Sequence, residues 1–144
     1  MGRDNQRTKA RLNERIRAIL EDGPMRSDDL HATMYRVYGH EKWSGLGSCA
    51  TMSQTMRQSG MFRRKHWIDN HGCHYEGSLT ASQLKKIGIC VEVRSVWENK
   101  TMDEIIAPFL YKTHTRRLIH KMPASVREAF NNKKALLVGE NNES

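Results

Sequence analysis

The chain has 144 residues, 38% of them hydrophobic, with a formal net charge of +8 and a sequence pI near 9.7. This length suits one compact domain, or a small domain with a helical extension, and leaves little room for a large enzyme cleft. The positive charge favours a polyanionic partner such as nucleic acid, or an acidic protein.

Cysteine content and hydropathy limit the environment of the protein. Three widely spaced cysteines, Cys49, Cys73 and Cys90, do not make a disulfide framework, so we expect a reducing, cytoplasmic setting. No apolar stretch approaches the roughly 20 residues that a membrane helix needs. The N-terminus is charged and lacks an apolar signal segment, so we expect neither secretion nor membrane insertion.

The first two predicted elements are helices. The first spans residues 6–21 and ends before Gly23-Pro24. Its apolar positions recur at helical spacing, and they are Leu12, Ile16, Ile19 and Leu20. Ser27 is predicted to cap a second helix, which stops at Gly39.

A third helix is predicted from Ser48 to Ser59, after a glycine-rich connection over residues 40–47, and Gly60 ends it. Its apolar face holds Cys49, Met52 and Met56. Its other faces carry Ala50, Thr51, Gln54, Thr55, Arg57 and Gln58, and no acid. Because acids would repel phosphates, this composition suits a helix that enters a DNA groove. A short polar surface helix can show the same pattern.

A β-hairpin is predicted next. Residues 61–68 form a strand that contains Arg63, Arg64 and Lys65, residues 69–72 turn, and residues 73–76 return. Short polar side chains on a helix can bond base edges, and the cations that follow can bond phosphates. This combination favours nucleic-acid binding.

The second half begins with a predicted capping box, Thr80 and Gln83, which opens a short helix that ends near Gly88. Apolar residues then alternate over residues 89–97, which predicts a strand with Cys90 buried in it.

Three helical segments are predicted after that strand. Thr101 and Glu104 form a second capping box, and Pro108 kinks or breaks the helix they open. Residues 112–121 read as a basic helical segment, and Pro123 permits a last helix. The chain is expected to fray over residues 139–144.

The order of helix, helix, longer turn, helix and β-hairpin resembles the winged helix-turn-helix family over residues 6–78, about half of the chain. The residues that carry the resemblance are Cys49, Met52, Met56, Gly60, Phe62 and Tyr75. The eight-residue connection before the third helix departs from the family. The resemblance implies an α+β, mainly helical fold. The chain would then divide into a nucleic-acid-binding domain over residues 1–78 and a helix-strand-helix extension over residues 79–144, which would serve dimerisation or partner binding.

In that family the third helix enters the major groove and the hairpin wing touches the DNA backbone or minor groove. The resemblance therefore implies base-facing roles for Thr51, Gln54, Thr55 and Gln58. Arg57 would reach a base or a phosphate. The wing cations Arg63, Arg64 and Lys65 would contact phosphates, and two of the three can do so because strand side chains alternate. We expect Trp67 to pack within the domain.

Metal binding and catalysis have little support. Three histidines and a cysteine cluster between residues 66 and 74, but they lack the paired spacing of a zinc site. The chain has no P-loop, G-x-S-x-G or H-E-x-x-H motif. We expect no metal, no cofactor and no enzymatic activity.

The leading hypothesis is a sequence-specific protein that binds double-stranded DNA, most simply a small transcription regulator, with a possible homodimer or protein contact through residues 79–144. One alternative is an adaptor or inhibitor that acts on an acidic partner such as a polymerase or nuclease complex. A further alternative is an accessory protein of DNA packaging or recombination.

Overall fold

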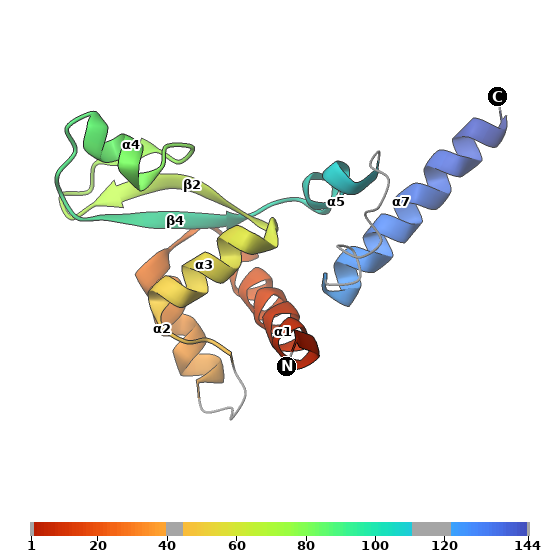
Figure 1. Cartoon of the computed structure of the whole chain (residues 1–144), viewed down its shortest axis with the longest axis horizontal. Helices are drawn as coiled ribbons and strands as arrows, with labels where there is room; N and C mark the ends of the chain where they lie inside the picture. Colours follow the sequence, from red (N-terminus) through yellow and green to blue (C-terminus); the bar gives the residue numbers. More distant parts are fainter. Residues whose placement is uncertain (1, 40–44, 111–121, 144) are drawn as a thin grey trace.

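The computed structural model describes residues 2–39, 45–110 and 122–143. Helices make up about 57% of the structure and pack with a four-stranded antiparallel sheet, so the predicted α+β class is confirmed (Figure 1). In chain order the elements are α1 (Gly2–Leu20), β1 (Met25–Arg26), α2 (Ser27–Tyr38), α3 (Cys49–Ser59), β2 (Phe62–Asp69), β3 (His74–Glu76), α4 (Ala81–Lys86), β4 (Val93–Asn99), α5 (Met102–Leu110) and α7 (Ala124–Glu143).

Helices α1, α2 and α3 bury their apolar faces in one core. The buried residues of these helices include Leu12, Ile16, Leu20, Leu30, Met34, Met52 and Met56. Burial of each such side chain contributes about 1.5–3 kcal/mol, so the helical spacing of these residues accounts for how the three helices pack. The predicted third helix is confirmed, and the predicted first helix is present but begins at Gly2 rather than at residue 6.

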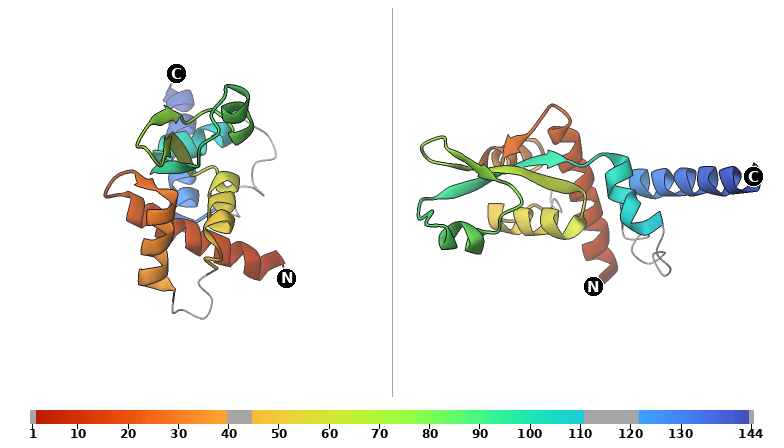
Figure 2. Two further views of the ribbon diagram at one scale, coloured as in Figure 1. Left: turned by 90° about the vertical axis from the view of Figure 1, so that its left-hand side faces the viewer. Right: turned by 90° about the horizontal axis from the view of Figure 1, so that it is seen from above.

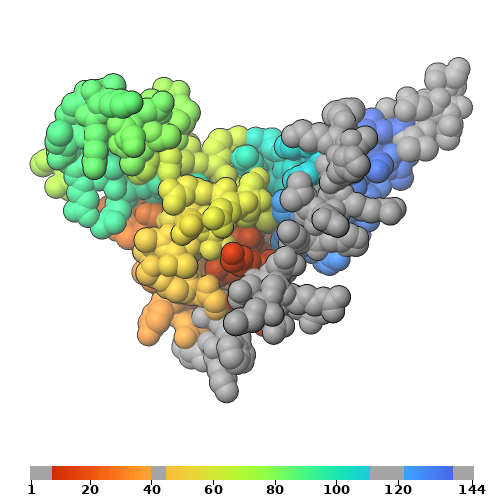
Figure 3. Space-filling model, in the orientation of Figure 1, coloured from red at the N-terminus to blue at the C-terminus, as the bar shows by residue number. Residues whose placement is uncertain are grey.

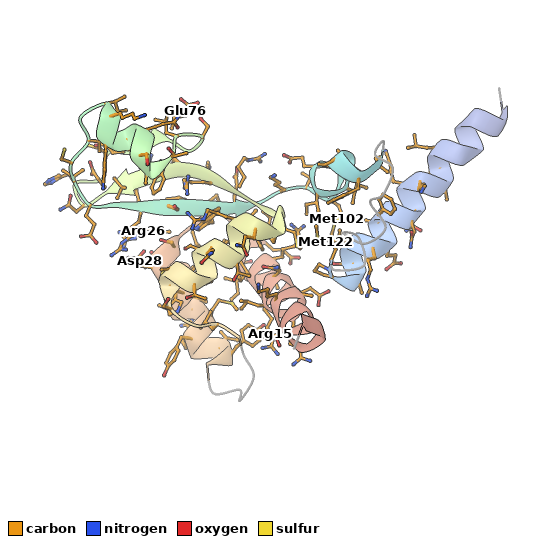
Figure 4. The ribbon with its side chains drawn as sticks, viewed as in Figure 1. Arg15, Arg26, Asp28, Glu76, Met102 and Met122 are labelled. Carbon is orange, nitrogen blue, oxygen red and sulfur yellow. The ribbon has the colours of Figure 1, made fainter. Side chains whose placement is uncertain are left out.

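The start of α2 differs from the prediction. Arg26 occupies the N-cap position without a side-chain capping bond, and Ser27 is the first helical residue and is buried. Met25 and Arg26 pair with Trp97 and Val96 of β4. This pairing ends the extended segment at Arg26, so the helix begins at Ser27, one residue earlier than a Ser27 cap would allow. Arg26 Nε instead bonds Asp28 over 2.6 Å (Figure 4).

Local chemistry sets both ends of α3. The Ser48 hydroxyl accepts a hydrogen bond from the Thr51 backbone N–H over 3.1 Å. At the other end Gly60 has φ 71°, a left-handed conformation that glycine adopts without strain. The chain then turns directly into β2.

The sheet has the strand order β1-β4-β2-β3. Strand β4 pairs with β1 on one side and with β2 on the other, and every pairing is antiparallel. The two expected parts of the chain share this sheet, since β4 comes from residues 79–144 and the other strands come from residues 1–78. In Figure 2, α3 runs along the strands while α1 crosses them.

Strand β4 begins later than predicted, at Val93 rather than Ile89. The predicted capping box of α4 is present, and the Ile89 N–H bonds the Leu84 carbonyl oxygen over 3.0 Å. Residue 89 therefore belongs to the turn that follows α4. Cys90, which was predicted to be buried, is exposed, because the strand that would bury it starts after it.

Helices α5 and α7 extend the core at one end of the sheet. Ile105 and Ile106 of α5 and Val126 and Phe130 of α7 are buried. Met102 and Met122 lie where these helices meet the body of the protein (Figure 4).

The far part of α7 projects away from the sheet and α1–α3 (Figure 1). This helix continues through Gly139 to Glu143, where the chain was expected to fray. A glycine within a helix costs only about 1 kcal/mol and need not end it. The basic segment predicted over residues 112–121 lies outside the described residues.

The predicted hairpin is confirmed, and Asp69 holds its turn. The Asp69 carboxylate accepts hydrogen bonds from the backbone N–H groups of His71 and Cys73 and from the Tyr75 hydroxyl, over 2.8, 2.9 and 2.7 Å. These bonds, chiefly the one from Tyr75, lower the pKa of Asp69. The same contact raises the pKa of Tyr75 to about 12.

The turn should therefore depend on pH at both extremes. The contribution of Tyr75 to stability is complete below about pH 10, the pKa of an unfolded tyrosine, and is lost as pH rises through about 12. Asp69 has the opposite sign. Its contribution is complete above about pH 4 and is lost as pH falls through its lowered folded pKa.

An ultraviolet titration of tyrosinate should contain a step near pH 12 that Tyr75→Phe removes. Ionisation of Tyr75 near pH 10 in the folded protein would contradict this.

Candidate nucleic-acid interface

The outward side of α3 carries most of the residues predicted to face bases. Those exposed are Thr51, Gln54, Arg57 and Gln58. Met52 and Met56, on the opposite side of the helix, are fully buried and fix α3 to the core. Figure 3 displays α3 at the surface, near the middle of the face drawn. The polar side chains therefore stand on an anchored helix that has no acidic residue.

The threonines of α3 are engaged within the helix. Thr51 Oγ1 lies 2.9 Å from Ser48 Oγ. Thr55 is half-buried, and its hydroxyl donates to the Thr51 carbonyl oxygen over 3.1 Å. Gln54 and Gln58 are the longer exposed side chains, and so they have the greater reach toward a partner.

Arg63 is held by two carboxylates. Its Nε lies 2.9 Å from Glu98 of β4, the residue opposite it in the sheet, and its Nη1 lies 2.5 Å from Glu104 of α5. Hydrogen bonds to Glu98 and then Glu104 raise the pKa of Arg63. Glu104 also accepts hydrogen bonds from the backbone N–H and the hydroxyl of Thr101, and the bond from the N–H, followed by the bond from Arg63, lowers the pKa of Glu104. Arg63 thus joins β2, β4 and α5.

Arg64 is directed inward by an irregularity in β2. Arg64 pairs with Trp97 and His66 pairs with Val96, so Lys65 is an extra residue, a bulge, with no partner in β4. In a regular strand Arg64 and Trp67, three residues apart, would point to opposite faces. The bulge brings them to one face, where the Arg64 guanidinium lies 3.8 Å from the centre of the Trp67 ring.

The surroundings of Arg64 are those of a structural residue. Its Nε donates to Ser95 Oγ over 2.8 Å, and its Nη1 donates to the carbonyl oxygens of Gly77 and Leu79 over 3.4 and 3.3 Å. Burial, and then repulsion from Arg57, lowers the pKa of Arg64. Trp67 is buried and its indole N–H donates to the Leu79 carbonyl oxygen over 2.9 Å, so the prediction that it packs is confirmed.

Lys65 is exposed, as Arg63 is, but unlike Arg63 it has no ion-pair partner among the described residues. Sequence reasoning grouped it with Arg63 and Arg64 and missed the partners of both arginines. Those partners, Glu98, Ser95 and Glu104, lie 31 to 41 residues further along the chain, and no local pattern identified them.

A groove of about 260 Å³ separates α3 from the sheet. Ala50, Ser53 and Arg57 line it from α3, a different side of the helix from Gln54 and Gln58. Strands β2 and β4 line it from the other side. Helix α3 therefore has three distinct sides, one in the core, one exposed and one facing the groove.

The clustered histidines form no metal centre among the described residues. The rings of His66 and His74 stack with centroids 4.2 Å apart. No group of three or more His, Cys, Asp or Glu in the described part of the chain could hold a metal ion. Over the same residues, no helix combines the length and apolar character needed to cross a membrane.

Comparison with protein-family models, curated proteins and solved structures finds no match to this chain.

The bulge should be sensitive to substitution at Gly77. A Cβ at this position would overlap the Arg64 carbonyl oxygen and lie 2.8 Å from the Lys65 carbonyl oxygen. Since both are backbone atoms, Gly77→Ala should lower the free energy of unfolding by about 1–3 kcal/mol, as measured by urea denaturation. Ser78→Ala, at the exposed neighbouring position, is the control and should change it by less than about 0.5 kcal/mol. Equal stability of the two variants would argue against a tight fit at the bulge.

Proposed function

We propose that the protein binds double-stranded DNA with sequence preference through the exposed side of α3, and that it acts as a small cytoplasmic transcription regulator. One observation carries the proposal: Gln54, Arg57 and Gln58 are exposed on an acid-free helix whose other side is locked into the core by two methionines. Glutamine can pair with adenine and arginine with guanine in the major groove. The proposed activity is binding and not catalysis.

The arrangement of elements supports a winged helix-turn-helix interpretation. Three packed helices come first, and the third passes through Gly60 directly into antiparallel strands β2 and β3. In this interpretation α3 is the recognition helix and the segment between β2 and β4, which includes β3 and α4, is an enlarged wing.

The phosphate contacts proposed for the wing come from lysines. Lys65 in the bulge and Lys85 and Lys86 in the last turn of α4 are exposed. Figure 3 displays α4 on the same face of the molecule as α3. The proposed interface leaves out Arg63 and Arg64, because their guanidinium groups already bond carboxylates, carbonyl oxygens and aromatic rings within the chain.

A second candidate function is protein recognition through α7, and it rests on one observation. Leu136 is 64% exposed on the part of α7 that projects from the body (Figure 1). Such a helix would join two copies of the chain, or would dock an acidic partner in an adaptor or inhibitor. A packaging or recombination protein would form assemblies larger than a dimer.

Light scattering of the wild type and of Leu136→Glu separates these alternatives. If the protein self-associates through α7, the substitution lowers the measured molar mass; if it binds another protein instead, the molar mass stays the same.

DNA binding can be tested by fluorescence anisotropy with several short duplexes. We expect log affinity to fall steeply with log salt, because bound phosphates release counterions. Lys65→Gln should weaken binding to every duplex and reduce the salt slope by about 1. Lys134→Gln removes the same charge from α7 and is the matched control. Absent or salt-insensitive binding would reject the proposal.

Sequence preference is tested separately. Gln54→Ala should change the preference at one base pair by about 1–3 kcal/mol while leaving the salt slope as it is. The measurement is a set of anisotropy titrations in which each base pair of a preferred duplex is replaced in turn. A uniform loss of affinity across all of these duplexes would show that Gln54 does not read a base.

A further inference from the structure

The groove between α3 and the sheet has the chemistry of a binding site. Its volume of about 260 Å³ lies just below the range of roughly 300–1,000 Å³ that is usual for small-molecule sites, and it is too small for a helix or a duplex. An occupant of this groove would therefore be a small molecule.

Positive charge dominates the walls of the groove. Three of its lining residues are arginines, Arg57 from α3, Arg64 from β2 and Arg94 from β4, and none of the lining residues is acidic. Arg64 is fixed by Trp67 and Ser95. Arg94 bonds Glu92 over 2.6 Å, and Glu92 does not line the groove. Guanidinium groups in this arrangement favour a carboxylate or phosphate group as their partner.

Aromatic and apolar side chains line much of the rest of the groove, beside the hydroxyl groups of Ser27, Ser53 and Ser95. Trp67 and Trp97 line it together with Val93 and Ala50. Trp97 is 2% exposed, and its indole N–H is buried without a hydrogen-bond acceptor in the described structure. Buried donors rarely lack a partner, so this wall of the groove contains a polar group that the described structure leaves unsatisfied.

From these features we infer that the groove binds a small organic anion, with an apolar body against Trp97 and a carboxylate or phosphate group held by Arg57 and Arg94. The inference does not require DNA binding. If the protein also binds DNA as proposed, Arg57 belongs to both sites, and the anion and the DNA would compete for its charge.

The indole N–H signals of the three tryptophans report on the groove directly in nitrogen–proton correlation spectra. The variants Trp43→Phe and Trp67→Phe assign the Trp97 signal by elimination. Benzoate and phenyl phosphate supply the two anionic groups on one apolar body, and benzyl alcohol is the uncharged control. We expect a saturable shift of the Trp97 signal with at least one of the anions, which then identifies the preferred group, and none with benzyl alcohol.

Two variants test the site itself. Ser53→Phe fills the groove from α3 and should abolish the response without removing a charge. Arg57→Gln should weaken anion binding about tenfold or more, since a charged hydrogen bond is lost. Lys134→Gln, on α7, should leave the affinity for the anion unchanged. If Ser53→Phe does not fold, the difference in anion affinity between Arg57→Gln and Lys134→Gln tests the site instead.

Two results would overturn the inference: no saturable shift of the Trp97 signal with either anion, or an equal shift with benzyl alcohol. The benzoate titration contains no DNA, so its failure and a failure of DNA binding are separate results.

Discussion

The antiparallel pairing of β2 with β4, and the bulge at Lys65 within it, decides which side chains meet on each face of the sheet. The register places Arg63 opposite Glu98, and the bulge brings Arg64 to the same face as Trp67. Gly77 allows the chain after β3 to approach the bulge closely. A strand without the extra residue would separate Arg64 from Trp67, and the wall of the groove would lose its fixed cation.

This pairing also changes how the net charge of +8 should be interpreted. The guanidinium groups of Arg63 and Arg64 stabilise contacts between strands and helices, and Glu98 and Glu104 offset the charge of Arg63, so Arg63 adds little to the attraction of a partner. The cations of the proposed DNA interface are instead exposed residues whose side chains are not bonded across the sheet, and they include Arg57 and Lys65. Proteins need such cations in excess of their internal ion pairs to bind a polyanion.

Helix α3 connects the two proposals. Met56 anchors it, Gln58 faces outward, and Arg57, between them in sequence, lines the groove while its side chain remains exposed. Successive residues of a helix point about 100° apart, so a single turn can serve the core, the surface and the groove. An anion in the groove would act on the proposed DNA interface through charge, without any movement of the backbone.

Interactions between residues close together in the chain were predicted from the sequence alone. The capping boxes at Thr80 and Thr101, the end of α3 at Gly60 and the turn at Asp69 each involve residues a few positions apart, and all were anticipated. The start of α2, the start of β4 and the partners of Arg63 and Arg64 were not. They depend on strand register, which is set by residues tens of positions away and leaves no local signature. Folding thus decided which cations became structural and which remained available, because only the paired strands bring their partners within bonding distance.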